Sequence, residues 1–207
     1  MVKLSINPNY LGEKTSEEMQ AFFEEEAFIQ LNEFFNIEVD RINSDFNELI
    51  FSRVFNPMRY KFKEVNLEEL KRKNKNNIFS QITTILESVD FLEFVSSMSQ
   101  FDLDLREIRL RKYANSDFVI LNDQEKETDT IDVYFDLSNV WNEDFGGKLT
   151  YTSSEEELFY LHPTFNNLSL IFKPDGVQKY LKYVNCLAHN NAILRFELKF
   201  DFVEEEE

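Results

Sequence analysis

A change of hydrophobic period near Phe101 constrains this 207-residue chain more than any other feature. Before Phe101, apolar residues recur at every third or fourth position, which is typical of helices with one buried face. After it, apolar and polar residues alternate, which is typical of strands. The alternation is clearest over 193–202, where one face would carry Leu194, Phe196, Leu198, Phe200 and Phe202, and the other Arg195, Glu197, Lys199 and Asp201. The chain is therefore predicted to be helical first and β-structured second.

The two periods predict an ordered set of elements. Helices are expected from about residue 15, over 38–52 and over 78–99, the last as one helix or a pair, with a short strand at 27–32. Strands are expected at 105–113, 118–121, 131–137, 148–152, 158–161, 168–172, 180–187 and 193–202. Eight short strands after a helical half favour an α+β fold. Its core would be a double-stranded β-helix, or jelly-roll, with the N-terminal helices packed on one sheet.

Glycine and proline are scarce, with four of each, and no repeat or flexible linker interrupts the chain. We therefore expect one domain over 1–203, with a helical part at about 1–100 and the jelly-roll at about 101–203. The four glutamates 204–207 are expected to form an acidic tail. A single cysteine, Cys186, excludes an internal disulfide.

The net charge of the chain limits the classes of partner that it is expected to bind. The net charge is −17, so a phosphate backbone would be repelled, and a nucleic-acid partner is not expected. The basic run at 71–75 is interpreted as a solvated face, and the net charge favours a basic protein partner. No apolar run reaches about 18 residues and the start has no signal-peptide pattern, so no membrane span and a cytoplasmic location are expected. The oligomeric state is left open.

From about residue 28 to 202 the chain resembles the prolyl-hydroxylase-like iron(II)/2-oxoglutarate oxygenases, in particular the ribosomal prolyl hydroxylase-like branch. Segments 29–35, 87–94 and 109–113 are similar to that family's opening strand, a helix and its first core strand. The richest likeness comprises 133–137, Trp141, the run Gly146-Gly147-Lys148-Leu149, and 162–172 with its Pro163, Asn166, Leu168 and Phe172. All these matches are in the family's order, so the resemblance implies the jelly-roll fold with Fe(II) and 2-oxoglutarate as cofactors.

The resemblance also locates a metal site, which is built in the family from His-x-Asp and a distal histidine on a facing strand. Here those positions fall on Asn122, Gln124 and Lys182. Two amides and an ammonium are poor metal ligands, so no metal and no catalytic residue are expected. Asp123 would point the other way in a strand register. His162 and His189 begin no His-x-Asp motif, and neither is expected to bind metal.

The co-substrate positions are half retained. Arg195 matches the arginine that holds the distal carboxylate of 2-oxoglutarate, and Tyr113 matches a tyrosine that often bonds the same carboxylate. Glu197 stands where the family has a small hydroxyl residue. Because residues i and i+2 of a strand share a face, Glu197 is expected to compete for Arg195 and to repel a dianion. Binding of 2-oxoglutarate is therefore doubtful, and no cofactor is expected.

Three functions follow from the resemblance. The first is a non-catalytic member, a pseudoenzyme, that binds a protein or peptide through the old substrate groove. The second is an active 2-oxoglutarate-dependent prolyl hydroxylase of a protein substrate. The third is a carboxylate or 2-oxoglutarate sensor without chemistry. The sequence shows no phosphate-binding loop, dinucleotide fingerprint or nucleophile elbow that would favour another enzyme class.

Overall fold

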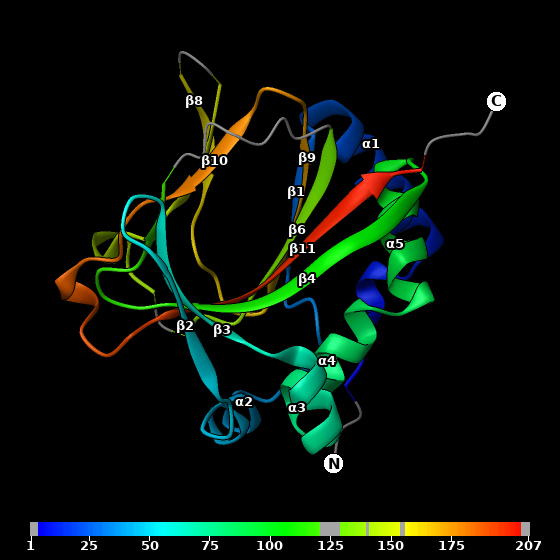
Figure 1. Cartoon of the computed structure of the whole chain (residues 1–207). Coiled ribbons are helices and arrows are strands. Elements are labelled where there is room, and N and C mark those ends of the chain that lie inside the picture. The colour runs from blue at the N-terminus through cyan, green and yellow to red at the C-terminus, as the bar shows by residue number, and fades with distance from the viewer. Residues whose placement is uncertain (1–3, 121–128, 140, 154–155, 204–207) are drawn as a thin grey trace.

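The computed structural model describes residues 4–120, 129–139, 141–153 and 156–203 of the chain (Figure 1). Its helices are α1 (Glu13–Glu26), α2 (Val39–Phe46), α3 (Leu67–Lys73), α4 (Ile78–Leu86) and α5 (Val89–Ser99). Its strands are β1 (Phe28–Asn32), β2 (Phe51–Asn56), β3 (Tyr60–Val65), β4 (Leu103–Tyr113), β5 (Phe118–Val119), β6 (Thr130–Asp136), β7 (Leu149–Thr152), β8 (Glu157–Leu161), β9 (Asn167–Lys173), β10 (Gln178–Leu181) and β11 (Ile193–Phe202). Short 3-10 turns lie at Pro8–Tyr10, Glu143–Phe145 and Cys186–Ala188.

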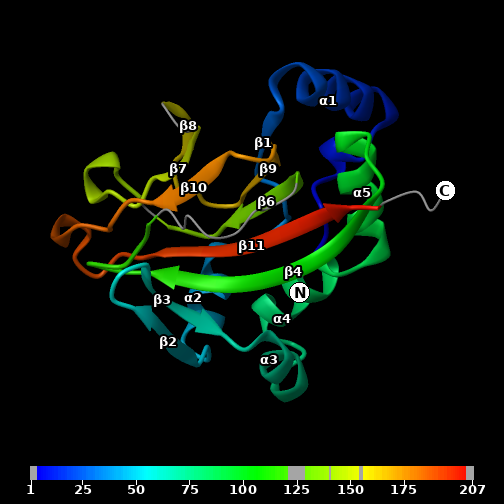
Figure 2. The same ribbon diagram turned by 45° about the horizontal axis from the view of Figure 1, so that its top comes forward.

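The described strands form one curled antiparallel sheet in the order β1-β9-β6-β11-β4-β3-β5-β10-β7-β8, with β2 added to β3. One half, β1-β9-β6-β11-β4, faces the other, β5-β10-β7-β8, as the long strands β4 and β11 curve beneath β10 and β8 (Figures 1 and 2). Strand β3 joins the halves, because Lys63–Val65 pair with β4 and Tyr60–Lys61 pair with β5. This is the expected α+β fold with a double-stranded β-helix.

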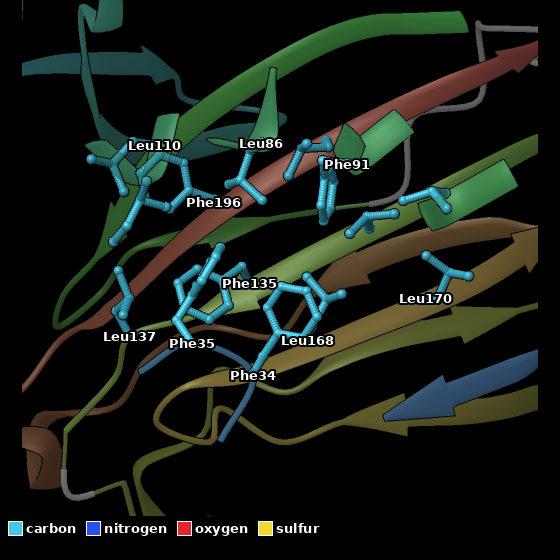
Figure 3. Packing of buried hydrophobic residues seen from close by; sticks show 14 of the residues in the cluster. Phe34, Phe35, Leu86, Phe91, Leu110, Phe135, Leu137, Leu168, Leu170 and Phe196 are labelled. Atoms are coloured by element: carbon cyan, nitrogen blue, oxygen red, sulfur yellow. The ribbon is translucent and has the colours of Figure 1, made fainter. Parts of the chain in front are cut away.

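The helices α1, α4 and α5 cover the outer face of the first half of the sheet (Figures 1 and 2). Strand β6 is buried on both faces, because Ile131, Val133 and Phe135 point to these helices while its alternate residues point into the barrel. Figure 3 shows Phe135 among Phe34, Phe35 and Leu168 in this outer core. A second apolar cluster fills part of the barrel and includes Phe62, Tyr113, Tyr134, Leu149, Tyr151, Leu161, Ile171, Leu181, Val184 and Ile193.

Most predicted elements are present with small shifts in their ends. The strand expected at 27–32 is β1, and the segment 78–99 is a pair of helices, α4 and α5. The pair is divided at Ser88, whose hydroxyl accepts a hydrogen bond from the Phe91 backbone N–H at 3.2 Å and so begins α5. The alternating face predicted for 193–202 is also confirmed, since Leu194, Phe196 and Phe200 lie in the outer core.

The helix expected over 38–52 is wrong in its second half. Helix α2 ends at Phe46, and β2 begins at Phe51 and forms an unpredicted hairpin with β3. Leu49 is buried although it lies in the connecting turn, so it extended an apparent helical period beyond the helix. The hairpin turn is stabilised by Asn56, whose side chain accepts from the Met58 backbone N–H at 3.0 Å, as asparagine often does in turns.

The strand expected at 180–187 is also wrong beyond Leu181, where β10 ends. Residues Cys186–Ala188 form a 3-10 turn instead, and Val184 contributes only an isolated bridge to Gly146. The Asn185 side chain accepts from the Leu187 backbone N–H at 2.7 Å, which offers the backbone a local alternative to the sheet ladder.

Candidate functional site

A groove of about 930 Å³ opens between the two halves of the barrel. Five apolar or aromatic residues, which come from the β2–β3 hairpin and from the end of β5, form one side of it: Val54, Tyr60, Phe62, Val119 and Ile120. The rest of the lining is mostly charged or polar, and from β4, β9, β10 and β11 it includes Glu107, Arg109, Arg111, Lys173, Gln178, Lys179, Glu197 and Lys199. Cations and anions are interspersed along this polar side, although the whole chain carries −17.

Arg195 holds a carboxylate, and that carboxylate belongs to the chain itself. Its Nε and Nη2 donate to Asp136 Oδ1 and Oδ2 at 2.9 Å each, a two-bond fork between paired residues of β11 and β6. The side chains are 0% and 2% exposed. Burial acts to lower the pKa of Arg195, but the charge and hydrogen bonds of Asp136, together with the nearby Glu197 and Tyr113, raise it overall. Within the described part of the chain, Arg195 does not line the groove.

Glu197 and Tyr113 lie next to this pair and bond to each other. The Tyr113 hydroxyl donates to Glu197 Oε1 at 2.6 Å, and Arg111 Nη1 donates to Glu197 Oε2 at 2.6 Å. Glu197 thus bonds Arg111 and Tyr113, and among the described contacts no hydrogen bond joins it to Arg195, which instead bonds Asp136. Burial acts to raise the pKa of Glu197, but the Arg111 guanidinium and the Tyr113 hydrogen bond lower it overall.

A second buried cluster is centred on Asp132 of β6. The Asp132 Oδ2 atom accepts from Lys179 Nζ at 2.8 Å and from the Tyr151 hydroxyl at 2.7 Å. Tyr134 joins the cluster through its hydroxyl, 3.0 Å from that of Tyr151. Burial acts to lower the pKa of Lys179, yet the Asp132 carboxylate raises it well above its ordinary value, so the ammonium stays protonated.

Lys182, on which the family resemblance placed the distal metal ligand, does not point into the barrel. It follows β10, and its side chain is exposed. Because strand residues alternate in direction, the inward positions of β10 are Lys179 and Leu181, so the ammonium that faces into the barrel is three residues earlier. Asn122 and Gln124 lie outside the described residues.

The two histidines lie apart from these clusters. His162 follows β8, with its Nε2 3.5 Å from Glu143, and burial lowers its pKa. His189 is exposed in the turn before β11. Over the described ranges, no three His, Cys, Asp or Glu side chains are grouped so that they could hold a metal ion.

Sequence reasoning identified Arg195, Tyr113 and Glu197 but missed Asp132, Asp136 and Lys179. A signal for the two aspartates was present, because Asp132, Tyr134 and Asp136 alternate within a strand that was predicted correctly. Their period of two places them on the face opposite Val133 and Phe135, which is the face that the barrel encloses. Lys179 was missed because its strand was placed two residues too late.

Comparison with known proteins identifies the family of the chain and agrees with its fold. The family described as "Oxoglutarate and iron-dependent oxygenase degradation C-term" matches residues 2–207. The chain therefore belongs to this family, and the resemblance to iron(II)/2-oxoglutarate oxygenases is confirmed. No curated protein matches the chain.

Solved structures agree on the fold. A 2-oxoglutarate–Fe(II) oxygenase family oxidoreductase from Burkholderia pseudomallei is similar at TM-score 0.63 and 10% identity, covering 94% of this chain and 96% of its own. A prolyl hydroxylase from Trichoplax adhaerens, in complex with a hypoxia-inducible factor oxygen-degradation-domain peptide, also gives 0.63, at 15% identity and coverage of 92% and 90%. A Pseudomonas putida prolyl-4-hydroxylase gives 0.58 at 11% identity, with coverage of 91% and 100%. No described helix is long and apolar enough to cross a membrane.

Proposed function

We propose that this chain is a non-catalytic member of the oxygenase fold that binds a protein or peptide partner through the groove. The observation that carries the proposal is that charged side chains inside the barrel are paired with one another. Arg195 is held by Asp136 away from the groove, and Lys179, which lines the groove, is held by Asp132. Because these inner charges are paired with side chains of the same chain, the barrel does not need a charged cofactor to neutralise them. The groove at its mouth is the surface that a partner can reach.

The residues present do not fit the family's iron. The facing strand of the barrel should offer a distal ligand, but the inward residues of β10 are Leu181 and a protonated Lys179. An ammonium has no lone pair for a metal and repels a divalent cation. Together with the amides expected at Asn122 and Gln124, this supports the loss of the metal site.

The co-substrate fits no better. A 2-oxoglutarate carboxylate would have to share Arg195 with Asp136, which already takes Nε and Nη2, and it would meet the negative Glu197 beside Tyr113. We therefore derive no reaction step through iron or 2-oxoglutarate in this chain.

A peptide partner is supported by the shape and chemistry of the groove. It combines an apolar side with interspersed charges, which suits an extended segment that carries both kinds of side chain. The Trichoplax relative was crystallised with a peptide fragment, so this fold accommodates a peptide in at least one protein. The expectation of a basic partner rests on the net charge of −17 and stays a prediction.

Purified chain incubated with Fe(II), ascorbate and 2-oxoglutarate is expected to form no succinate above the protein-free blank, because the arginine and the facing strand are occupied as described. The measurement is succinate release with and without prolyl peptides, alongside the iron content of the protein. Turnover with stoichiometric iron would instead establish the active hydroxylase. Saturable thermal stabilisation by 2-oxoglutarate without turnover would establish the carboxylate sensor.

The binding half of the proposal is tested by site-specific photo-crosslinking. A photoreactive residue at Gln178, exposed at the groove, is expected to capture a discrete partner in cells that express the chain. The same residue at Glu25, exposed on α1, is the matched control. Capture from Glu25 but not from Gln178 would place the partner elsewhere and contradict a groove-binding function.

A further inference from the structure

We propose that Asp136 is a built-in ligand of Arg195, so that the barrel retains a carboxylate site that is permanently occupied by its own chain. This deepens the proposed function and rests on it. Its consequence is specific: when the Asp136 side chain is removed, the site should accept a small external carboxylate such as formate or acetate.

The geometry is that of a bound ligand. Both Asp136 oxygens face the Arg195 fork at 2.9 Å, the bidentate arrangement that arginine makes with free carboxylates. The carboxylate is bound through the Nε and Nη2 edge of Arg195, while Nη1 is buried and has no acceptor among the described residues. Asp136 is supported from behind by Ser138, whose hydroxyl lies 3.5 Å from Oδ1 and also accepts from the Leu194 backbone N–H at 3.1 Å.

The positions of Asp136 and Arg195 in the sheet make the Asp136 carboxylate hard to displace from Arg195. Arg195 and Asp136 are register partners on neighbouring strands, so the carboxylate is presented at fixed geometry and at high effective concentration. The pair is closed off from the groove, because neither residue lines it within the described part of the chain. An external dicarboxylate would have to enter a buried space and displace a tethered competitor.

The neighbouring contact is occupied in the same way. Tyr113 is fully buried, and it donates to Glu197 at 2.6 Å. Glu197 is in turn fixed by Arg111, which also bonds Glu64 through Nε at 2.9 Å. Two internal carboxylates, Asp136 and Glu197, thus take the two donors to which the family resemblance would assign the co-substrate.

The alternative explanation is that Asp136 and Arg195 form an ordinary structural ion pair. The two explanations differ in what happens after truncation. A structural pair loses stability and stays destabilised, whereas a carboxylate site is restored by any carboxylate small enough to fill the space that the Asp136 side chain leaves. Formate is the smallest such probe.

The test is chemical rescue of Asp136→Ala. Its melting temperature is expected to fall below that of the unmodified chain, and about 100 mM sodium formate should raise it by about 3–5 °C relative to the same concentration of sodium chloride. The unmodified chain should show no formate-specific rise, and about 1 mM 2-oxoglutarate should not stabilise it. Near the melting temperature the chain unfolds and refolds in the presence of formate, so formate can be enclosed during refolding. Slow entry into the folded, buried site therefore does not prevent rescue.

Two controls make the result specific. The double variant Asp136→Ala/Arg195→Met should lose the formate effect, because its guanidinium is gone. Acetamide, which has nearly the shape of acetate without its charge, should not rescue Asp136→Ala. If Asp136→Ala does not fold in chloride, recovery of folded protein on refolding into formate becomes the measurement.

Absence of a formate-specific rise or recovery in Asp136→Ala overturns the inference, as does an equal rise in the unmodified chain or its saturable stabilisation by 2-oxoglutarate. The proposed function fails by a different result, namely turnover of 2-oxoglutarate by the unmodified chain. A missing rescue without turnover therefore removes the inference alone.

Discussion

Arg195→Met is expected to lower the free energy of unfolding by about 3–5 kcal/mol, one of the two largest single-residue effects that we predict. The replacement leaves the Asp136 carboxylate buried without its counter-charge, and that carboxylate is only 2% exposed. Burial already acts to raise the pKa of Asp136, and Arg195 is the main influence that opposes this rise. Urea denaturation near neutral pH measures the effect.

The double variant Arg195→Met/Asp136→Leu should recover most of the lost stability, because apolar side chains of similar volume commonly replace a buried ion pair without loss. Arg106→Met is the matched control. Arg106 pairs with Asp201 at 3.4 Å, with the two side chains 49% and 41% exposed, and its loss should cost less than about 1 kcal/mol. A double variant no more stable than Arg195→Met would show that the pair is not replaceable in this way.

Phe135→Ala is expected to cost about 3–5 kcal/mol in the free energy of unfolding, because it opens a cavity in the outer core. Phe135 is 0% exposed, and its ring lies 4.9 Å from that of Phe35 and 6.4 Å from that of Phe196, between centroids. Figure 3 shows Phe35 beside Phe135, although the two residues come from separate segments of the chain. The central position of β6 leaves little freedom to collapse around the missing ring. Thermal or urea denaturation gives the measurement.

The same substitution at Phe22 is the control, since Phe22 is 49% exposed on α1. Its loss should change stability by no more than about 0.5 kcal/mol. Comparable losses at the two positions would mean that Phe135 does not organise the core as its contacts indicate.

The β-rich half of the fold could be predicted closely because alternation directly reports which strand face is buried. Strand β11 shows this, with apolar residues toward the helices and charged residues toward the barrel. The hairpin β2–β3 could not be predicted in the same way. It begins just after a helical face that ends at Leu49, and local periodicity does not reveal that the chain reverses there to join β4 with β5.

Site residues could be predicted where the family resemblance marked their positions. Their partners could not be predicted where the pairing depends on how strands align across the sheet. Arg195 was recognised from its strand, but its partner depends on the register between β11 and β6, which aligns Arg195 with Asp136. Lys179 and Asp132 meet across the barrel from strands that are not neighbours, so no sequence spacing relates them. Lys182 lies outside the barrel because β10 ends one residue before it, at Leu181.

Strand β3 has a mechanical consequence for any molecule that approaches the barrel. This six-residue strand pairs with β4 at one end and with β5 at the other. The two halves of the sheet therefore cannot separate there without breaking these pairings. The width of the groove between the two halves is thus fixed by a single short strand. We therefore expect a partner that binds in the groove to do so with little rearrangement of the backbone.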